Sequence, residues 1–161
     1  FLLRNPIDRA YSLYNHLVFT GREKSQTFEE AIAKEPERLK DLKKPVKPKE
    51  VPHLSYNYYH FSYLKRGYYH EQIKEWFKYF QRKQIYITSS KSFYKNKQKE
   101  VDNIFTFLGL HTHRLKYIEN LNKGKYKKKM NSKTRSELIK HFKPYNKKLY
   151  SLIGQTFDWE K

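Results

Sequence analysis

The chain has 161 residues and no cysteine, and it carries 35 lysine and arginine residues against 16 aspartate and glutamate residues, a formal net charge of +19. This length suits one domain with its own core, and the lack of cysteine excludes disulfide bonds and thiolate metal sites. No apolar run approaches about 18 residues, so the sequence predicts no membrane span. The charge predicts attraction to polyanions, but 27 of the basic residues are lysines spread along the chain, which is typical of a solvated surface.

The first sixteen residues predict the end of a strand, a turn and then a helix. Phe1-Leu2-Leu3 is an apolar stub, and Pro6 suits the first position of a helix because proline has no N–H to leave unpaired. Asn5 is then the expected N-cap, Asp8 complements the helix dipole in the first turn, and Gly21 is the expected stop. The apolar residues recur at the spacing of a helix packed on a sheet: Ile7, Ala10, Tyr11, Tyr14, Leu17 and Val18.

Arg4 carries a guanidinium at the end of the expected strand, and Ser12 carries a hydroxyl on the expected helix. Ser12 lies off the apolar stripe, so the two side chains could converge on one anion beside the helix N-terminus, as in many phosphate sites. The alternative is that Arg4 pairs with Asp8 and Ser12 is an ordinary helix residue. The chain also starts at the end of a strand without methionine, so we expect it to be the C-terminal portion of a longer protein.

Two segments follow before the aromatic part of the chain. Thr27-Phe28-Glu29-Glu30 has the form of a capping box and predicts a short helix that ends at Pro36. Residues 37–53 are rich in lysine and proline, with Pro45, Pro48 and Pro52, and predict an exposed loop. This loop is either a surface excursion or a functional loop, namely a lid or a loop that binds a substrate.

Aromatic residues are dense from Tyr56 to Leu64, and Lys65 and Arg66 follow them. Aromatic side chains with lysines among them along the chain could stack on single-stranded bases. A helix is expected from Tyr68 to about Phe80, and its aromatic and apolar residues keep helical spacing, which favours a role in the core. Ile85 to Thr88 predicts a second buried strand. The residues of the expected helix that should be buried are Ile73, Trp76, Phe77 and Phe80.

The last third predicts further helices around a basic loop. One helix carries Val101, Ile104, Phe105 and Leu108 and stops at Gly109; another begins at Ser132 and runs to Phe142; a third restarts at Pro144 and ends before Gly154. Between them lie Lys123, Gly124 and Lys125, where glycine would permit close approach of the backbone to a phosphate. The alternative for this loop is a solvated charge run. His111 and His113 have no carboxylate at a suitable spacing, so no metal site is expected.

The run Arg4-Asn5-Pro6-x-Asp8-Arg9-Ala10-Tyr11-Ser12 resembles the 3′-phosphate motif of sulfotransferases that use 3′-phosphoadenosine 5′-phosphosulfate (PAPS), particularly the bacterial and heparan-sulfate types. Later segments resemble the same family in order: residues 27–36, residues 63–69, Trp76, residues 107–110, Arg135, Leu138, Phe142, Pro144, Asn146, Leu149, Gly154 and Trp159. The resemblance implies that Arg4 and Ser12 hold the 3′-phosphate and that Lys123, Gly124 and Lys125 cover the cofactor phosphates.

The resemblance also implies the fold and the reaction. The fold is α/β, part of a P-loop-like three-layer sulfotransferase fold with a parallel sheet, mostly helical in this portion, and residues 1–161 form a single truncated domain. The reaction is transfer of a sulfuryl group from PAPS to a hydroxyl or amine of a small molecule or a glycan, which can be anionic. No metal and no specific nucleic acid are expected, and a cytoplasmic setting is preferred.

The chain departs from the family pattern in three places. Lys91 follows the second strand where many relatives have an acidic residue, and Asn96-Lys97 replaces their Asp-Pro. No G-x-x-x-x-G-K-[ST] loop occurs, so the catalytic residues are expected upstream of Phe1, and these 161 residues are expected to be inactive alone. The competing hypotheses are a basic nucleic-acid-binding module, a related nucleotide-dependent phosphotransferase, and a degenerate remnant with a structural role.

Overall fold

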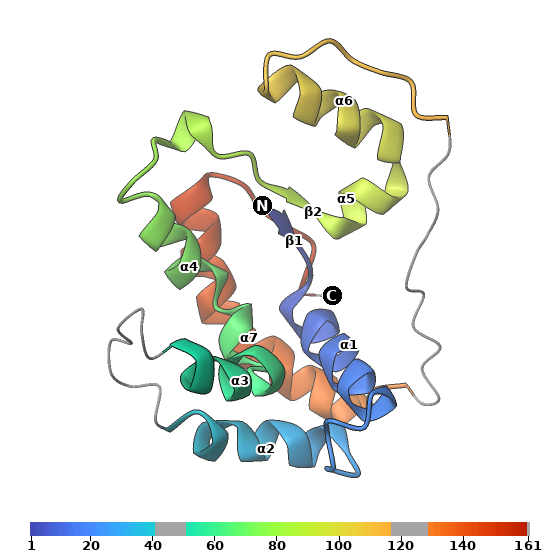
Figure 1. Cartoon of the computed structure of the whole chain (residues 1–161), viewed down its shortest axis with the longest axis vertical. Coiled ribbons are helices and arrows are strands. Elements are labelled where there is room, and N and C mark those ends of the chain that lie inside the picture. Colours follow the sequence, from blue (N-terminus) through green and yellow to red (C-terminus); the bar gives the residue numbers. More distant parts are fainter. Residues whose placement is uncertain (41–50, 117–128, 161) are drawn as a thin grey trace. The chain divides into compact units, whose positions relative to one another are not determined.

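The computed structural model describes residues 1–40, 51–116 and 129–160, with the backbone alone for residues 51–55. Its elements are two short strands, seven α-helices and two 3₁₀ turns among the described residues (Figure 1). Their bounds are β1 Leu2–Leu3, α1 Pro6–Phe19, α2 Phe28–Arg38, α3 Val51–Phe61, η3 Lys65–Gly67, α4 Tyr69–Trp76, η4 Arg82–Gln84, β2 Thr88–Ser89, α5 Ser90–Lys95, α6 Lys97–Phe107 and α7 Ser132–Ile153.

The chain divides into two compact units. We call the first the strand unit, which comprises Phe1–Arg4 and Glu71–Lys123, and the second the helical unit, which comprises Asn5–His70 and Gly124–Lys161. In the strand unit β1 pairs in parallel with β2, with Leu2 opposite Thr88 and Leu3 opposite Ser89. The predicted second strand is therefore present, but it covers Thr88–Ser89 rather than Ile85 to Thr88. Ile85 and Ile87 are buried as expected.

Two helices follow β2 in the strand unit. Ser89 caps α5 by accepting a hydrogen bond from the Ser92 N–H. Thr88 Oγ1 donates to Glu100 Oε2 at 2.7 Å, which ties α6 to the strand. The helix predicted around Val101 is confirmed, and it stops before Gly109, whose φ is +69°. The strand unit therefore combines a two-stranded parallel sheet with α5 and α6.

The helical unit is built around α1. A stripe of α1 packs against α2, η3 and α7, because its apolar side chains recur every three to four residues. Gly67 of η3 lies so close to its neighbours that an added Cβ would be 2.7 Å from Phe142 Cε1 and 2.9 Å from Pro6 Cβ. The buried cluster consists of Ile7, Ala10, Tyr14, Leu17, Phe28, Ala31, Tyr63, Leu138 and Phe142.

The predicted helix end at Pro36 is wrong, since α2 continues to Arg38 with Pro36 inside it. Proline removes one hydrogen bond from the last turn, but two tertiary contacts hold that turn helical. The Glu35 carboxylate accepts the N–H groups of Leu64 and Lys65 at 2.7 and 2.8 Å, and Arg38 binds the Glu23 carboxylate. Tertiary contacts therefore override the local preference of proline.

Pro144 does not restart a helix, because α7 runs without a break from Ser132 to Ile153. Pro144 itself is exposed, so its missing N–H faces the solvent side of the helix. Buried residues lie on both sides of it along one face, and they keep both halves of α7 against the same core. These residues are Thr134, Leu138, Phe142, Asn146, Leu149 and Ile153.

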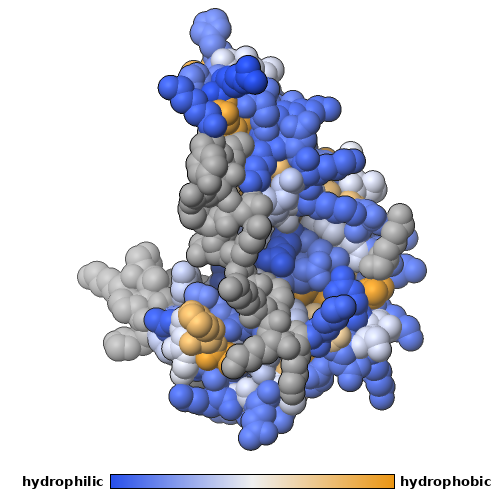
Figure 2. Space-filling model, turned by 90° about the vertical axis from the view of Figure 1, so that its right-hand side faces the viewer, coloured by the Kyte–Doolittle hydropathy of each residue, from blue (hydrophilic) through white to orange (hydrophobic). Residues whose placement is uncertain are grey.

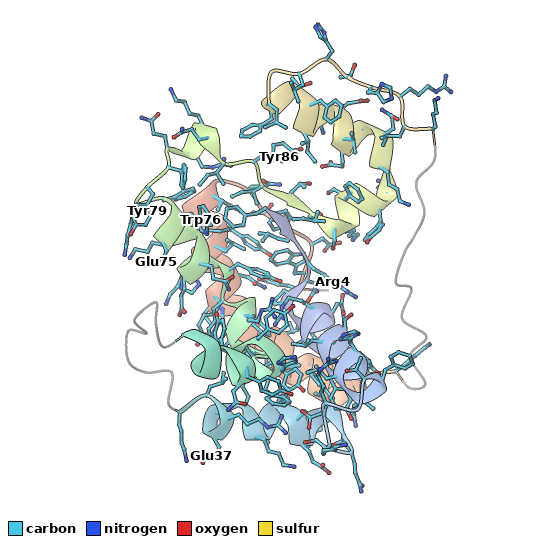
Figure 3. The ribbon with its side chains drawn as sticks, in the orientation of Figure 1. Arg4, Glu37, Glu75, Trp76, Tyr79 and Tyr86 are labelled. Atoms are coloured by element: carbon cyan, nitrogen blue, oxygen red, sulfur yellow. The ribbon has the colours of Figure 1, made fainter. Side chains whose placement is uncertain are left out.

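Of the side chains predicted to be buried in the helix from Tyr68 to about Phe80, Ile73 is buried, but Trp76 and Phe80 are exposed. Ile73 is 1% exposed, whereas Trp76 is 49% and Phe80 is 41% exposed. The helix ends at Trp76, and the following residues form turns instead of a fourth helical turn. Trp76, labelled in Figure 3, packs edge-on against Phe1 with 5.8 Å between the ring centres, and its ring centre lies 5.5 Å from that of Phe80. These three side chains form an exposed aromatic group.

Helices occupy both ends of the lysine- and proline-rich segment predicted as a loop over residues 37–53. Helix α2 includes residues 37 and 38, and α3 begins at Val51 with Pro52 in its first turn. Residues 41–50, with Pro45 and Pro48, lie outside the described residues. The face in Figure 2 is predominantly hydrophilic with separate hydrophobic spots, as the lysine content predicts. None of the helices in the described parts of the chain is long and apolar enough to cross a membrane.

Candidate anion-binding site

The turn between β1 and α1 carries the predicted phosphate motif. Strand β1 ends at Leu3 and α1 begins at Pro6, so Arg4 lies in the turn (Figure 3). Asn5 is the N-cap, as predicted: its Oδ1 accepts the Ile7 N–H at 2.9 Å, and its Nδ2 donates to the Trp159 carbonyl at 3.2 Å. Of the N–H groups at the start of α1, Pro6 contributes none and that of Ile7 is taken by the cap.

Asp8 occupies the first turn of α1, as predicted, and its partner is on α7. Asp8 Oδ1 accepts from Arg135 Nη1 at 2.8 Å, across 127 positions of sequence. A second contact lies beside it, where the Thr134 hydroxyl donates to Glu29 Oε1. The first turn of α7 is therefore anchored to α1 and α2, and the negative charge of Asp8 is balanced by Arg135.

Ser12 lies on α1 and is half-buried, outside the set of buried residues that form the apolar stripe. Arg4 is the last residue of the first part of the strand unit, and Ser12 belongs to the helical unit. The convergence of Arg4 and Ser12 on one anion therefore stays a prediction. Lys123, Gly124 and Lys125 lie outside the described residues. The chain after them enters α7, which begins at Ser132 with Asn131 as its N-cap.

Arg9 has a structural role that the sequence analysis did not identify. Its Nη2 donates to the Ser62 carbonyl at 3.4 Å and also to the Tyr63 carbonyl. Burial lowers the pKa of the Arg9 guanidinium, although the nearby Tyr69 and Glu35 act in the opposite direction. Arg9 from α1 and Glu35 from α2 thus fix the turn that leads into η3. The sequence could have indicated this role, because Arg9 lies next to Ala10 at the edge of the apolar stripe of α1.

Glu23, Arg38 and Tyr63 form a second cluster that sequence reasoning missed. Arg38 binds Glu23 through two hydrogen bonds of 2.6 and 2.9 Å, and the Tyr63 hydroxyl donates to Glu23 Oε2 at 2.6 Å. Burial alone would raise the pKa of Glu23, but hydrogen bonds from Arg38, Tyr63 and Ser25 lower it well below its ordinary value. Burial, with a further contribution from Glu23, raises the pKa of Tyr63. These three residues lie in separate segments, and no local sequence pattern connects them.

The histidines of the described segments do not gather with acidic residues. Within residues 1–40, 51–116 and 129–160, no group of three or more histidine, aspartate or glutamate side chains is arranged to hold a metal ion. His111 and His113 lie in the segment after α6, where Gln98 Nε2 donates to the His113 carbonyl at 3.0 Å.

Comparison with known proteins gives three similarities. Residues 1–161 match the family described as "Sulfotransferase domain". The membrane-associated sulfotransferase kil1 of Dictyostelium discoideum is 27% identical over 107 residues, which are 62% of this chain and 21% of that protein. The crystal structure of a sulfotransferase from Alicyclobacillus acidocaldarius matches with a TM-score of 0.73 and 28% identity, over 99% of this chain and 56% of that one. The chain thus spans about a fifth of the curated relative and just over half of the solved structure.

Proposed function

Because the chain belongs to the sulfotransferase domain family, we propose that it contributes the 3′-phosphate part of the donor site of a PAPS-dependent sulfotransferase. The observation that carries this proposal is the strand, turn and helix over residues 2–19, with Arg4 in the turn and Ser12 on the helix. In the sequence, these two residues match the arginine and the serine of the 3′-phosphate motif that residues 4–12 resemble.

The side chains around this turn suit a phosphate. A guanidinium offers planar N–H donors to phosphate oxygens, and a serine hydroxyl can donate one more hydrogen bond. Asp8 would repel a phosphate if its charge were uncompensated, but Arg135 pairs with it at 2.8 Å. The formal charge of +19 further favours a ligand with several negative charges. The donor set therefore fits the 3′-phosphate of PAPS.

The remaining parts of the donor site follow from the family pattern. We propose that Lys123, Gly124 and Lys125 cover the cofactor phosphates, with glycine permitting close approach of the backbone. We also propose that residues 1–161 belong to one domain with a P-loop-like three-layer architecture. The small parallel sheet and the predominance of helices among the described elements agree with this architecture.

In the proposed reaction, PAPS supplies the sulfuryl group for an acceptor and leaves as adenosine 3′,5′-bisphosphate. The residues of this chain act by position. Arg4 and Ser12 hold the 3′ end of the donor, which fixes its orientation and removes rotational freedom before transfer. Asn5 and Pro6 fix the start of α1 and therefore the direction in which Ser12 is presented.

The acceptor is proposed to be a hydroxyl or amine of a small molecule or a glycan. The excess of lysine would favour an anionic acceptor over a cationic one. The preference for a cytoplasmic setting stays a prediction. The relative from Dictyostelium discoideum carries the description "membrane-associated", which applies to that protein.

Incubation of the 161-residue chain with PAPS labelled in the sulfuryl group tests this function. We expect label to be retained by the chain in equilibrium dialysis and to be displaced by adenosine 3′,5′-bisphosphate. We expect no labelled product with a panel of phenol, amine and glycan acceptors, because the sequence contains no glycine-rich loop for the 5′-phosphosulfate. Absence of binding would contradict the donor site, and transfer of label would contradict the expected inactivity.

A further inference from the structure

The chain after α7 folds back to the start of α1, within the helical unit (Figure 1). Gly154 caps α7 with a φ of +66°, which turns the chain away from the helix axis. We call residues 155–160 the tail. Its Trp159 carbonyl accepts a hydrogen bond from Asn5 Nδ2 at 3.2 Å. The tail therefore contacts the residue that follows Arg4 in the motif proposed to bind the 3′-phosphate.

Aromatic rings and hydrogen bonds hold Trp159 in this place. Its side chain is buried, and its ring centre lies 4.5 Å from that of Phe157, 5.9 Å from that of Tyr69 and 6.1 Å from that of Tyr150. The Tyr150 hydroxyl and the Trp159 N–H both donate to the Phe157 carbonyl at 3.0 Å. Because the Trp159 ring and the backbone before it are both held, the Trp159 carbonyl keeps one place beside α1.

Tyr69 gives the tail a second connection to α1. Burial lowers the pKa of Arg9, and Tyr69 offsets part of this effect, in part through a hydrogen bond. Arg9 also donates to the carbonyls of Ser62 and Tyr63. The ring that packs on Trp159 therefore belongs to a residue that is itself bound to the first turns of α1.

The Asn5 side chain uses both ends of its amide. Its Oδ1 accepts the Ile7 N–H at 2.9 Å and caps α1, while its Nδ2 donates to the tail. Serine and aspartate cap helices about as well as asparagine does, so helix capping does not by itself require an amide. The contact with the Trp159 carbonyl gives the amide nitrogen a second role, which is to fix the rotamer of the cap.

We propose that Trp159 is a positioning residue for the 3′-phosphate site, because its carbonyl orients the Asn5 amide. Asn5 in turn sets the turn after Arg4 and the start of the helix that carries Ser12. This inference rests on the proposed function. Side chains bind a ligand best when a surrounding shell of hydrogen bonds fixes the backbone that presents them. With the tail bound the motif keeps one geometry, and with the tail released the turn loses that constraint.

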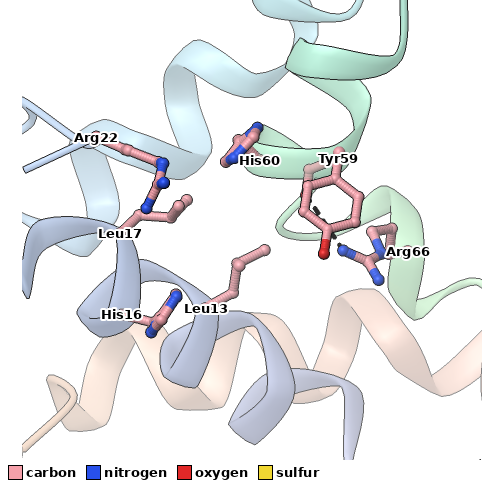
Figure 4. Close-up of a pocket in the computed structure, with 7 residues that line it drawn as sticks. All are labelled: Leu13, His16, Leu17, Arg22, Tyr59, His60 and Arg66. Carbon is pink, nitrogen blue, oxygen red and sulfur yellow. Dashed lines mark hydrogen bonds between the residues drawn. The ribbon is translucent and has the colours of Figure 1, made fainter. Parts of the chain in front are cut away.

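The tail contacts the N-terminal end of α1, whereas a pocket of the helical unit lies farther along the helix. This pocket has a volume of about 280 Å³, and from α1 it is lined by Leu13, His16 and Leu17 (Figure 4). Neither Asn5 nor the described tail, residues 155–160, belongs to its lining. A nucleotide bound in this pocket should therefore not depend on Asn5, and a variant of Asn5 distinguishes the two places.

Asn5→Ser tests the contact, with Asn131→Ser as its matched control. A serine hydroxyl can cap the helix, but it lies one bond closer to the backbone than the amide nitrogen and should not reach the Trp159 carbonyl. Asn131 caps α7 in the same way, by accepting the Lys133 N–H at 2.8 Å. Calorimetry should show that adenosine 3′,5′-bisphosphate binds about threefold to tenfold more weakly to Asn5→Ser, with no change for adenosine 5′-monophosphate. Asn131→Ser should bind both nucleotides like the unmodified chain.

Trp159 fluorescence measures whether the tail stays bound. The chain has two tryptophans, so Trp76→Phe leaves Trp159 as the only one, and Trp76 belongs to the strand unit. In this background acrylamide should quench the buried Trp159 weakly, and more strongly after Asn5→Ser but not after Asn131→Ser. Circular dichroism checks that the variants keep their helix content. Unchanged quenching in Asn5→Ser would overturn the proposal.

Tyr150→Phe loosens the tail without changing Asn5, because it removes the hydroxyl that donates to the Phe157 carbonyl. It should also weaken binding of the bisphosphate, and adding it to Asn5→Ser should cause no further loss, since both changes act through one contact. In Tyr150→Phe the bisphosphate should reduce the quenching of Trp159, because tail and ligand must favour each other by the same factor. Adenosine 5′-monophosphate should have no such effect.

The outcomes separate this inference from the proposed function. A chain that does not prefer the bisphosphate to the monophosphate would contradict the proposed function, and this inference with it. A chain that shows the preference and keeps it in full in Asn5→Ser would overturn this inference alone. The same holds if the losses of affinity from Asn5→Ser and Tyr150→Phe simply add, because the tail would then act by a route other than Asn5.

Discussion

Three side chains that are far apart in sequence, Glu23, Arg38 and Tyr63, share one buried cluster. Glu23 also accepts the N–H groups of Lys24 and Ser25 at 2.9 and 2.8 Å, so its carboxylate has at least five hydrogen bonds. An ion pair so well supplied with hydrogen bonds stabilises the fold, whereas loss of one partner leaves the other charge uncompensated. Glu35 is buried too, but it faces backbone N–H groups at the start of η3 and has a different pH behaviour.

Glu23→Gln should lower the free energy of unfolding at neutral pH by about 3 kcal/mol, because Arg38 loses its charged partner. The pKa of Glu23 is lowered in the folded state, so its contribution is present above its ordinary value of 4.5 and is lost as pH falls below that value. Urea unfolding across this range should therefore show a flatter acid dependence for Glu23→Gln than for the unmodified chain. An unchanged acid dependence would contradict the role of Glu23.

Glu35→Gln is the matched control for this experiment. Burial raises the pKa of Glu35, and the N–H groups of Leu64 and Lys65 offset only part of that effect. A carboxyl with a raised pKa binds its proton more tightly in the folded state, so its ionisation costs stability as pH rises above 4.5. Glu35→Gln should therefore remove this loss and keep the acid dependence that comes from Glu23.

At the scale of elements, η3 connects α1 to α7 through a glycine. A Cβ at Gly67 would lie 2.7 and 2.9 Å from two ring atoms of Phe142 and 2.9 Å from Pro6 Cβ. Phe142 is completely buried, so its ring has little room to move. By comparison, the Asp8 and Arg135 side chains are 40% and 36% exposed, and such an ion pair contributes only about 0–1 kcal/mol. Close packing at Gly67 and Phe142 therefore stabilises the position of α7 more than the ion pair does.

Gly67→Ala should destabilise the chain by about 1–3 kcal/mol through overpacking. Phe142→Leu removes the ring and should partly relieve that clash, so the double variant should lose less stability than the two single variants together. Gly109→Ala is the control. An alanine Cβ there would meet no atom within 4 Å, so the loss of stability comes from the backbone φ of +69° alone. The losses of stability from Gly109→Ala and Phe142→Leu should therefore simply add in the double variant. Urea unfolding measures all five variants, and strict additivity for Gly67→Ala with Phe142→Leu would contradict the packing argument.

At the scale of the whole molecule, the sequence predicts what depends on local chemistry. Asn5 and Thr27 cap helices as expected, and Gly21, Gly109 and Gly154 follow helix ends with positive φ, because these preferences act within a few residues. The helices that continue through Pro36 and Pro144 were not predictable, since contacts from distant segments hold them. Arg9 and Glu23 were missed for the same reason. The positions of Arg4 and Ser12 allowed one anion site to be proposed, but local rules did not decide between that site and a pair of Arg4 with Asp8, and only the family motif favoured the site.

The central claim is that Arg4 and Ser12 hold the 3′-phosphate of the donor. Calorimetry should measure the affinities of the unmodified chain, Arg4→Gln, Ser12→Ala and Arg114→Gln for adenosine 3′,5′-bisphosphate and for adenosine 5′-monophosphate. The unmodified chain and Arg114→Gln should bind the bisphosphate about tenfold or more tightly than the monophosphate, because one charge-assisted hydrogen bond contributes about that much affinity. This preference should be lost in Arg4→Gln and reduced in Ser12→Ala. Equal affinity of the unmodified chain for both nucleotides, or an unchanged preference in Arg4→Gln, would contradict the account.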